Sequence, residues 1–250
     1  MHDTATTVDR ISAIRRDEVE AQAATEHRRV WELLSSLDDE DWAKPTDCAA
    51  WDVRAMAGHV LGMMEGFARF REWAHQMRAG GKAAGGGPFI DGMTAVQVRE
   101  RAGLDRTELL ARMAAAGPKA ARARTKVPSP LRRMPMKEEV GGQPETWRLG
   151  YLLDVILTRD PWMHRVDISR ATGREVVLTP EHDGRIIADV VAEWARRHGQ
   201  PFTLLLHGPA GGAYTQGAGG EEIAVDAVEF CRILSGRASG TGLLTQEVPF

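Results

Sequence analysis

The helical spacing of apolar residues over the first 173 positions is the feature that most constrains what this chain can fold into. Between residues 52 and 77, Val53, Met56 and Val60 recur at intervals of three and four, which marks one face of a long helix. Similar patterns predict helices at residues 10–37, 93–102, 105–124 and 145–172. We therefore expect a mainly α protein in which residues 1–173 form a bundle of about four helices with long connections.

The pattern changes after Gly173, where glycine and alternating apolar residues become frequent. Thr179 and Pro180 occupy the N-cap and the first turn of a predicted amphipathic helix. The segments PFTLLLHG and GAYTQG then have the pattern of strands joined by glycine-rich turns, and EEIAVDAVEFCRILSGRASG that of a strand followed by a helix. Residues 174–250 are therefore predicted to form a small α+β domain appended to the bundle.

Two connecting segments of the predicted bundle lack a helical pattern. The glycine-rich run AGGKAAGGGPF at residues 79–89 predicts a mobile loop, and whether it closes over a site as a lid stays open. The segment VPSPLRRMPMKEEVGGQP, which begins at Val127, predicts an irregular crossing between two helices.

The composition excludes several classes of protein. Among the 250 residues, 43% are apolar and 27% are charged, as in an ordinary soluble globular protein. The net charge of -3 offers no basic surface for nucleic acid, and no apolar run approaches the roughly 20 residues of a membrane span. The N-terminal segment is too polar for a secretory signal, and two cysteines make no disulfide framework. We expect a cytoplasmic protein, a monomer or weak homodimer, with neither nucleic acid nor membrane as partner.

The predicted long helix carries His59 beside a ridge of glycines. Gly58, Gly62 and Gly66 follow one another at one helical turn, although each costs about 1 kcal/mol relative to alanine inside a helix. Glycines at this spacing allow another backbone or a ligand to come close. Two interpretations are open: tight helix packing around a core histidine, or a histidine that binds a ligand together with partners from elsewhere in the chain.

The segment ILTRDPWMHRVDI supplies such partners. Asp160 and His164 are four residues apart, so their Cβ atoms lie about 6 Å apart on one helix face. A carboxylate and an imidazole at this spacing can bind one cation, and His59 would add a second nitrogen while leaving coordination positions open. Asp167 either orients the imidazole of His164 or pairs with a neighbouring arginine. The spacing alone does not decide between a metal site and a chance pair.

Several of these residues together resemble a known family, the mycothiol-dependent maleylpyruvate isomerases, within the DinB-like metal-binding four-helix bundles. Its first motif combines two tryptophans, a turn and a ligand histidine, matched here by Trp42, Pro45, Thr46, Cys48, Trp51 and His59. Its second motif, acid-x-x-x-His-x-x-Asp, is matched by Asp160, His164 and Asp167. The segment CRILSGRASG resembles an element that places an arginine at the active site, which here is Arg237.

The resemblance implies a divalent metal, most naturally zinc, bound by His59, Asp160 and His164, with mycothiol as thiol cosubstrate. Arg237 would hold a carboxylate of substrate or cofactor as a bidentate donor. Two departures concern the first acid position, where the family has glutamate and this chain has Asp160, followed by Pro161. Because proline disrupts a helix, a kink at Pro161 would carry the shorter carboxylate toward the metal, while a simple helix break is the alternative.

The leading hypothesis for function is a thiol-dependent transferase or isomerase in which the metal activates the cofactor thiolate for addition to an electrophilic small molecule. A metal-dependent hydrolase is an alternative, and Asp167 or Glu65 would have to serve as its general base. A non-catalytic, metal-stabilised binding or regulatory protein is a third possibility. We expect Cys48 and Cys231 to be buried as small hydrophobic residues rather than to act as nucleophiles.

Overall fold

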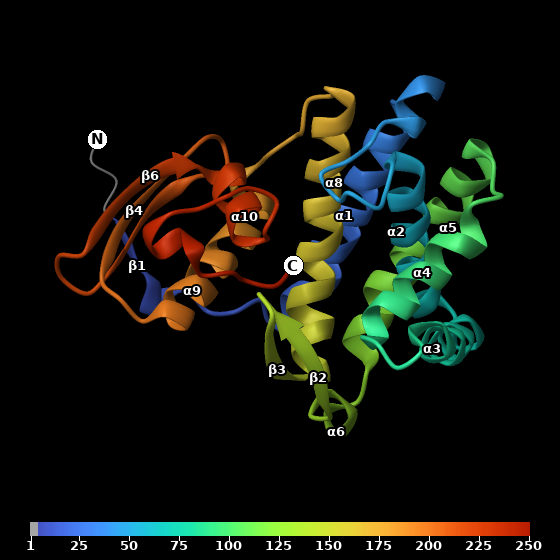
Figure 1. The fold of residues 1–250 in the computed structure, drawn as a ribbon, viewed down its shortest axis with the longest axis horizontal. Coiled ribbons are helices and arrows are strands. Elements are labelled where there is room, and N and C mark those ends of the chain that lie inside the picture. The colour runs from blue at the N-terminus through green and yellow to red at the C-terminus, as the bar shows by residue number, and fades with distance from the viewer. Residues whose placement is uncertain (1–4) are drawn as a thin grey trace.

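The structure, a computed structural model, describes residues 5–250 and contains a helical bundle beside a small α+β unit (Figure 1). The long bundle helices are α1 (Arg16–Ser35), α2 (Val53–Ala68), α5 (Arg106–Lys126) and α8 (Leu157–Thr172). They pack in a ring, because α1 contacts α5 and α8, and α2 contacts the same two helices. Val53, Met56 and Val60 are fully buried in its core, as their spacing predicts. The expected mainly α fold with a four-helix bundle is confirmed.

The helix predicted for residues 52–77 is broken into two. Helix α2 ends at Ala68, Arg69 is extended (φ -142°, ψ 118°), and α3 (Phe70–Ala84) leads back toward α4 (Phe89–Arg101). The mobile loop predicted for residues 79–89 was therefore wrong, because α3 continues to Ala84 and only a short turn at Gly85 (φ 57°) precedes α4. The glycines serve a different purpose there. A Cβ atom on Gly80 would lie 2.9 Å from the backbone of Met93, so the small residue allows α3 and α4 to approach closely.

The predicted irregular crossing contains an antiparallel hairpin of β2 (Pro135–Val140) and β3 (Gln143–Arg148). Gly141 and Gly142, with φ values of 56° and 74°, form its two-residue turn, which requires positive φ at both positions. The helix predicted to begin at residue 145 was wrong in its start, since the segment up to Arg148 is strand. The remaining short elements around the bundle are η2 (Asp39–Ala43), α6 (Ser129–Arg132), α7 (Leu149–Tyr151) and the π-helical turn η3 (Leu152–Ile156).

The α+β unit holds a four-stranded sheet with the order β1-β5-β4-β6. Its strands are β1 (Thr6–Thr7), β4 (Phe202–His207), β5 (Gly212–Gln216) and β6 (Glu221–Asp226). Its helical elements are η1 (Val8–Arg10), η4 (Pro180–Gly184), α9 (Arg185–His198), α10 (Ala227–Leu234) and η5 (Gly242–Thr245). The prediction of a helix from residue 10 was wrong, because β1 joins this sheet in parallel with β5 and α1 begins only at Arg16.

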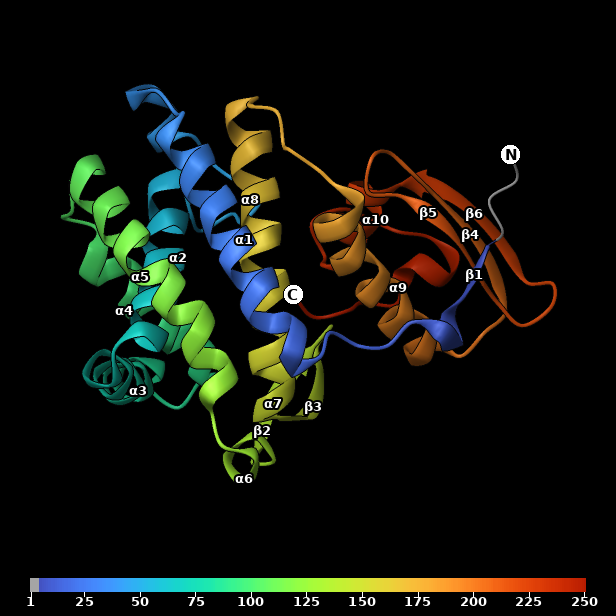
Figure 2. The ribbon, with the colours of Figure 1, turned by 180° about the vertical axis from the view of Figure 1, so that it is seen from behind.

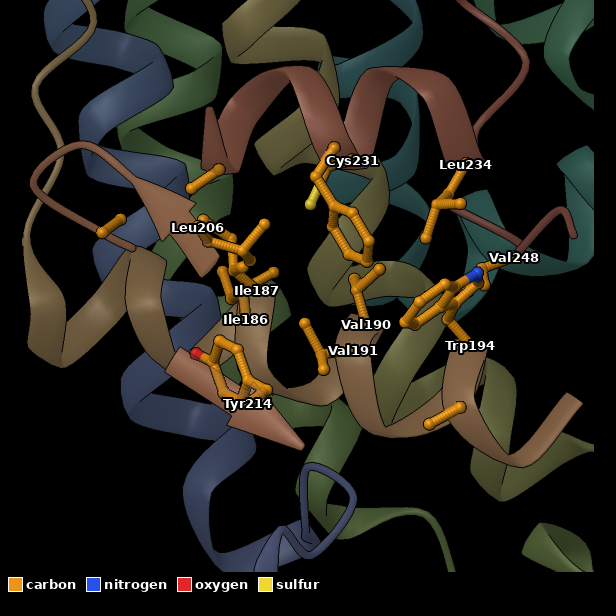
Figure 3. Close-up of a cluster of buried hydrophobic side chains, with 14 of the residues drawn as sticks. Ile186, Ile187, Val190, Val191, Trp194, Leu206, Tyr214, Cys231, Leu234 and Val248 are labelled. Carbon is orange, nitrogen blue, oxygen red and sulfur yellow. The ribbon is translucent and has the colours of Figure 1, made fainter. Parts of the chain in front are cut away.

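Helices α9 and α10 lie between the sheet and α8 in both views of the ribbon (Figures 1 and 2). Their apolar faces form the second core, in which Trp194 of α9 and Cys231 and Leu234 of α10 turn toward one another (Figure 3). Gly173 ends α8 in the left-handed conformation (φ 70°), and Pro180 occupies the first turn of the next helical segment. The division into residues 1–173 and 174–250 stays a prediction, with the qualification that β1 belongs to the sheet of the second unit.

No helix within residues 5–250 combines the length and the apolar character needed to cross a membrane.

Candidate metal centre

His59 of α2 and Asp160 and His164 of α8, the three ligands that the resemblance implies, converge inside the bundle. Nε2 of His164 lies 3.2 Å from Oδ1 of Asp160, and Nε2 of His59 lies 3.5 Å from Oδ2 of the same carboxylate. The candidate ligand atoms of the three residues lie within 4.8 Å of one another. Both imidazoles are buried, whereas the Asp160 side chain is 21% exposed, so solvent reaches the cluster at Asp160. Trp51 lies against both rings, with centroid distances of 4.9 Å and 5.7 Å.

A chain of two glutamines sets which nitrogen of His59 carries the proton. Nε2 of Gln76 donates to the backbone carbonyl of Gly62 at 2.8 Å, which leaves Oε1 of Gln76 to accept from Nε2 of Gln97 at 2.8 Å. Oε1 of Gln97 then accepts from Nδ1 of His59 at 2.8 Å. Because a backbone carbonyl can only accept, each donor in this chain is assigned in turn, and the lone pair of His59 stays on Nε2.

His164 is oriented by a second polar group. Its Nδ1 lies 3.3 Å from Oδ2 of Asp167, a fully buried carboxylate. Arg237, from the segment that follows α10, donates to Asp167 through Nε (2.8 Å) and Nη2 (2.9 Å). The structure therefore places Asp167 where it orients His164, and it directs two of the Arg237 nitrogens to Asp167. Nη1 of Arg237 makes no hydrogen bond within the described part of the chain.

Cys48 also belongs to this group of side chains, so its expected role as a buried hydrophobic residue was wrong. It is partly exposed, and its Sγ lies 3.5 Å from Nη2 of Arg237 and 3.8 Å from Oδ2 of Asp167. The thiol faces a carboxylate and a guanidinium, while the residue also packs against the edge of the bundle core. Cys231, in contrast, is fully buried in the core of the α+β unit, as expected, and burial raises the pKa of its thiol.

Asp160 and His164 stabilise each other's charges. Burial disfavours the ionised form of Asp160, yet the facing imidazoles of His164 and His59 hold its pKa well below the ordinary range. Burial likewise disfavours the charged form of His164, but Asp160 outweighs it and raises the pKa of His164 well above 6.5. A divalent cation at this cluster would therefore compete with a proton on His164, and its binding would release that proton.

Two unpartnered atoms of the cluster indicate which kind of ligand it can bind. Nε2 of His59 and Oδ2 of Asp160 are buried and have no hydrogen-bond partner among residues 5–250. Because Nδ1 of His59 points at Gln97, its Nε2 lone pair faces Oδ2 of the Asp160 carboxylate, and these two groups repel unless a positive charge lies between them. Ligand atoms of a tetrahedral site with bonds of about 2 Å are roughly 3.3 Å apart. The separations of 3.2 Å and 3.5 Å, measured to the two oxygens of Asp160, are of this order, so the three residues can hold a divalent cation.

Two further groups of potential ligands are neutralised by arginine. Cys48, His164 and Asp167 lie close together, but Arg237 occupies both oxygens of Asp167. A third group, which lies between α1 and the turn η4, consists of Glu26, His182 and Asp183. Its carboxylates are paired with the guanidinium groups of Arg165 and Arg29. Each of these groups is already paired with arginine, which leaves His59, Asp160 and His164 as the one such group within residues 5–250 that has no arginine partner.

The simple helix break that was the alternative at Pro161 is not observed, and the kink hypothesised there stays a prediction. Helix α8 includes Pro161 in its second turn, and the irregularity precedes it as the π-helical turn η3. Gln76 and Gln97 were not anticipated, since nothing in the sequence marks a glutamine on a neighbouring helix as a partner of His59. The sequence did mark Cys48 and Trp51 as neighbours of the site, because both belong to the motif that also contains His59.

The comparisons with known proteins agree with this arrangement. The model of the mycothiol maleylpyruvate isomerase N-terminal domain matches residues 23–169, which is more than half of the chain. The chain belongs to this family. Among solved structures, the mycothiol-dependent maleylpyruvate isomerase matches with a TM-score of 0.55 and 17% identity over 98% of both chains. Its histidine-to-alanine mutant matches with a TM-score of 0.55 and 16% identity over 94% of this chain and 93% of that one.

At this level of identity the structural matches establish the fold, which includes both the bundle and the α+β unit. No curated protein matches the sequence. The suspected family is thereby confirmed, and it is an enzyme family. The matched range ends at residue 169 and contains His59, Asp160, His164 and Asp167, whereas Arg237 lies outside it.

Proposed function

We propose that this family member is a metal-dependent enzyme that uses a low-molecular-weight thiol, mycothiol, in a transferase or isomerase reaction on an electrophilic small molecule. The observation that carries the proposal is the convergence of His59, Asp160 and His164 with two buried atoms that have no partner among the described residues. Two imidazoles and one carboxylate suit zinc, and three protein ligands leave a position open for an exogenous group. When bound, such a metal lowers the pKa of a coordinated thiol so that it is a thiolate near neutral pH.

The residues around the cluster have separate tasks in this proposal. Gln97 and Asp167 hold the two imidazoles with their Nε2 atoms toward the metal position. Trp51 covers both rings and excludes water from that side. Arg237 retains Nη1, which supports a role in binding a carboxylate of the substrate or of the thiol, while its other donors hold Asp167. The partly exposed Asp160 marks the side from which substrate and thiol would enter.

The hydrolase alternative has less support. Its two candidate general bases are both held in ion pairs, Asp167 by Arg237 and Glu65 by Arg101 and Arg112. Guanidinium donors occupy oxygens of both carboxylates, and His164 and Arg237 hold the pKa of Asp167 below its usual range despite its burial. Activation of an external thiol needs no such base, because the metal itself stabilises the deprotonated sulfur.

Metal analysis combined with a thiol-conjugation assay tests the proposal. The purified protein should contain one divalent ion, and with mycothiol it should convert some members of a panel of electrophiles, including maleylpyruvate. His164→Ala should lose both metal and activity, because two remaining ligands hold zinc poorly. His75→Ala is the matched control, since this exposed histidine of α3 pairs with Glu100 of α4 and contacts none of the three ligands. The proposal would be contradicted if the wild-type protein retained no metal and converted none of the electrophiles in the presence of mycothiol.

A further inference from the structure

We propose that Arg124 of α5 is a positioning residue of the metal centre, which holds the irregular start of α8 in the shape that presents Asp160. The inference rests on the proposed function, because it concerns how the chain prepares the same metal cluster. Arg124 does not contact His59, Asp160 or His164. It acts through the backbone of the segment that carries Asp160.

The first element of the argument is the π-helical turn η3. In a regular helix the N–H of Leu157 would donate to the carbonyl of Leu153, four residues earlier. Here it donates to the carbonyls of Leu152 and Val155 and not to that of Leu153, which therefore loses this helical partner. A π-helical turn contains one extra residue, and such turns occur mostly as single insertions at functional sites. The residues on its two sides are rotated by about 100° relative to a continuous α-helix.

The second element is Pro161, which directly follows Asp160. Proline has no backbone N–H, so the carbonyl of Leu157, four residues earlier, has no helical donor either. The carbonyls of Leu153 and Leu157, one turn apart on the same side of the helix, therefore both lack a helical donor. The cause is the π-helical turn for Leu153 and the proline for Leu157. A buried carbonyl without a donor costs roughly as much as a lost hydrogen bond, so this turn needs an external donor.

Arg124 supplies the missing donors. Its Nε and Nη2 donate to the carbonyl of Leu153 at 2.8 Å and 2.5 Å, and its Nη1 donates to the carbonyl of Leu157 at 2.9 Å. Nη2 also donates to the hydroxyl of Thr158 at 2.7 Å. The side chain is 2% exposed and its guanidinium contacts no carboxylate within the described residues, so it is a buried cation used to bind backbone. The planar fork of arginine matches two carbonyls one turn apart, which a single ammonium group does not.

Burial of this cation is costly, which indicates that the contact is specific. Burial lowers the pKa of Arg124 to about 9, and the nearby charges of Asp154 and Asp160 counteract this only in part. The group remains protonated at neutral pH. Asp154 itself is paired with Arg132, so it does not hold Arg124 in place.

The test compares metal affinity in variants that remove and restore the donors. Arg124→Met keeps an unbranched side chain that ends before the guanidinium and has no donors, and we expect metal affinity to fall by at least about tenfold, as when the support of a ligand is lost. Arg124→Met combined with Pro161→Ala should recover part of this loss, because an alanine in place of the proline would again offer a backbone N–H to the carbonyl of Leu157. Affinity is measured by competition with a chromogenic chelator, and hydrogen exchange of residues 152–161 in the metal-free protein reports the turn itself.

Two further variants separate positioning from general stability. Arg29→Met removes another mostly buried arginine, which pairs with Asp183 outside the metal cluster, and should lower the melting temperature without changing metal affinity. Arg124→Lys keeps the charge on one donor nitrogen. If Arg124→Met does not fold, the metal affinity of Arg124→Lys is compared with that of the wild-type protein instead. Wild-type affinity in the Arg124 variants, or a loss that Pro161→Ala does not relieve, would overturn the inference. Wild-type protein that binds no metal would overturn the proposed function instead, and the exchange data would still decide whether Arg124 holds the turn.

Discussion

Replacing Gly62 of α2 with alanine should weaken metal binding, although alanine is the better helix former. The three glycines of this helix face α3 and α4, and a Cβ atom would meet different neighbours at each. At Gly62 it would lie 2.6 Å from Cβ and 2.7 Å from Cγ of Gln97, closer than real Cβ atoms approach. Gln97 must therefore move, and its Oε1 is the acceptor that holds Nδ1 of His59.

The magnitude follows from two opposing effects. Glycine to alanine inside a helix stabilises by about 1 kcal/mol, whereas overpacking a buried contact costs about 1–3 kcal/mol. Gly62→Ala should thus lower the free energy of unfolding by up to about 2 kcal/mol and, by displacing Gln97, reduce metal affinity by about 10- to 100-fold. Gly58→Ala is the matched control. Its Cβ would lie 3.5 Å from Cβ of Arg101, an ordinary contact, so it should raise stability by up to about 1 kcal/mol and keep the metal affinity.

Urea denaturation and chelator competition on the two variants measure both quantities. Folded Gly62→Ala with wild-type metal affinity would refute the reasoning that Gln97 orients His59. An equal loss of affinity in Gly58→Ala would refute the assignment of the effect to Gln97, because that variant leaves the glutamine in place.

Two other predictions concern ionisable groups. Burial, and then the charge of Arg124, lowers the pKa of His27 from 6.5 to about 4, so unfolding takes up a proton between these pH values. Stability from this group is complete above pH 6.5 and is lost as the pH falls through 4, a loss of about 3 kcal/mol that His27→Gln should remove in acid-unfolding curves. Arg237→Ala removes the guanidinium partner of the buried carboxylate of Asp167, so the free energy of unfolding should fall by about 3–5 kcal/mol. Turnover should fall as well while metal is retained, and loss of the metal on analysis of the folded variant would contradict the separate roles of arginine and ligands.

Much of the bundle was predictable because helical periodicity is a local property. The apolar face of α2, the end of α8 at Gly173 and the i, i+4 spacing of Asp160 and His164 depend only on neighbours one or two turns away. The motif that contains Trp51 and His59 was readable for the same reason. Such features persist in any fold that keeps these segments helical, so sequence reasoning identifies them without knowledge of tertiary contacts.

Two of the errors share one cause, which is the ambiguity of glycine. Gly80 was interpreted as part of a mobile loop, although it lies in a helix and allows α3 to contact α4. Gly141 and Gly142 form a tight hairpin turn rather than an irregular crossing. A missing side chain permits flexibility, a turn or a close approach, and only the neighbouring chain decides which. The same dependence on neighbours holds for β1, whose two residues become a strand because β5 offers them a free edge.

The sequence by itself predicted the helical bundle, the α+β character of the residues after Gly173 and the three residues that meet in the candidate metal cluster, since these depend on periodicity and on motifs of short range. Only the tertiary structure decided how that cluster is held. Gln97 lies 38 residues from His59, Arg124 lies 29 residues from Leu153, and Arg237 lies 70 residues from Asp167. A hydrogen bond depends on the position and direction of two atoms, and for residues so far apart in the chain packing alone sets both.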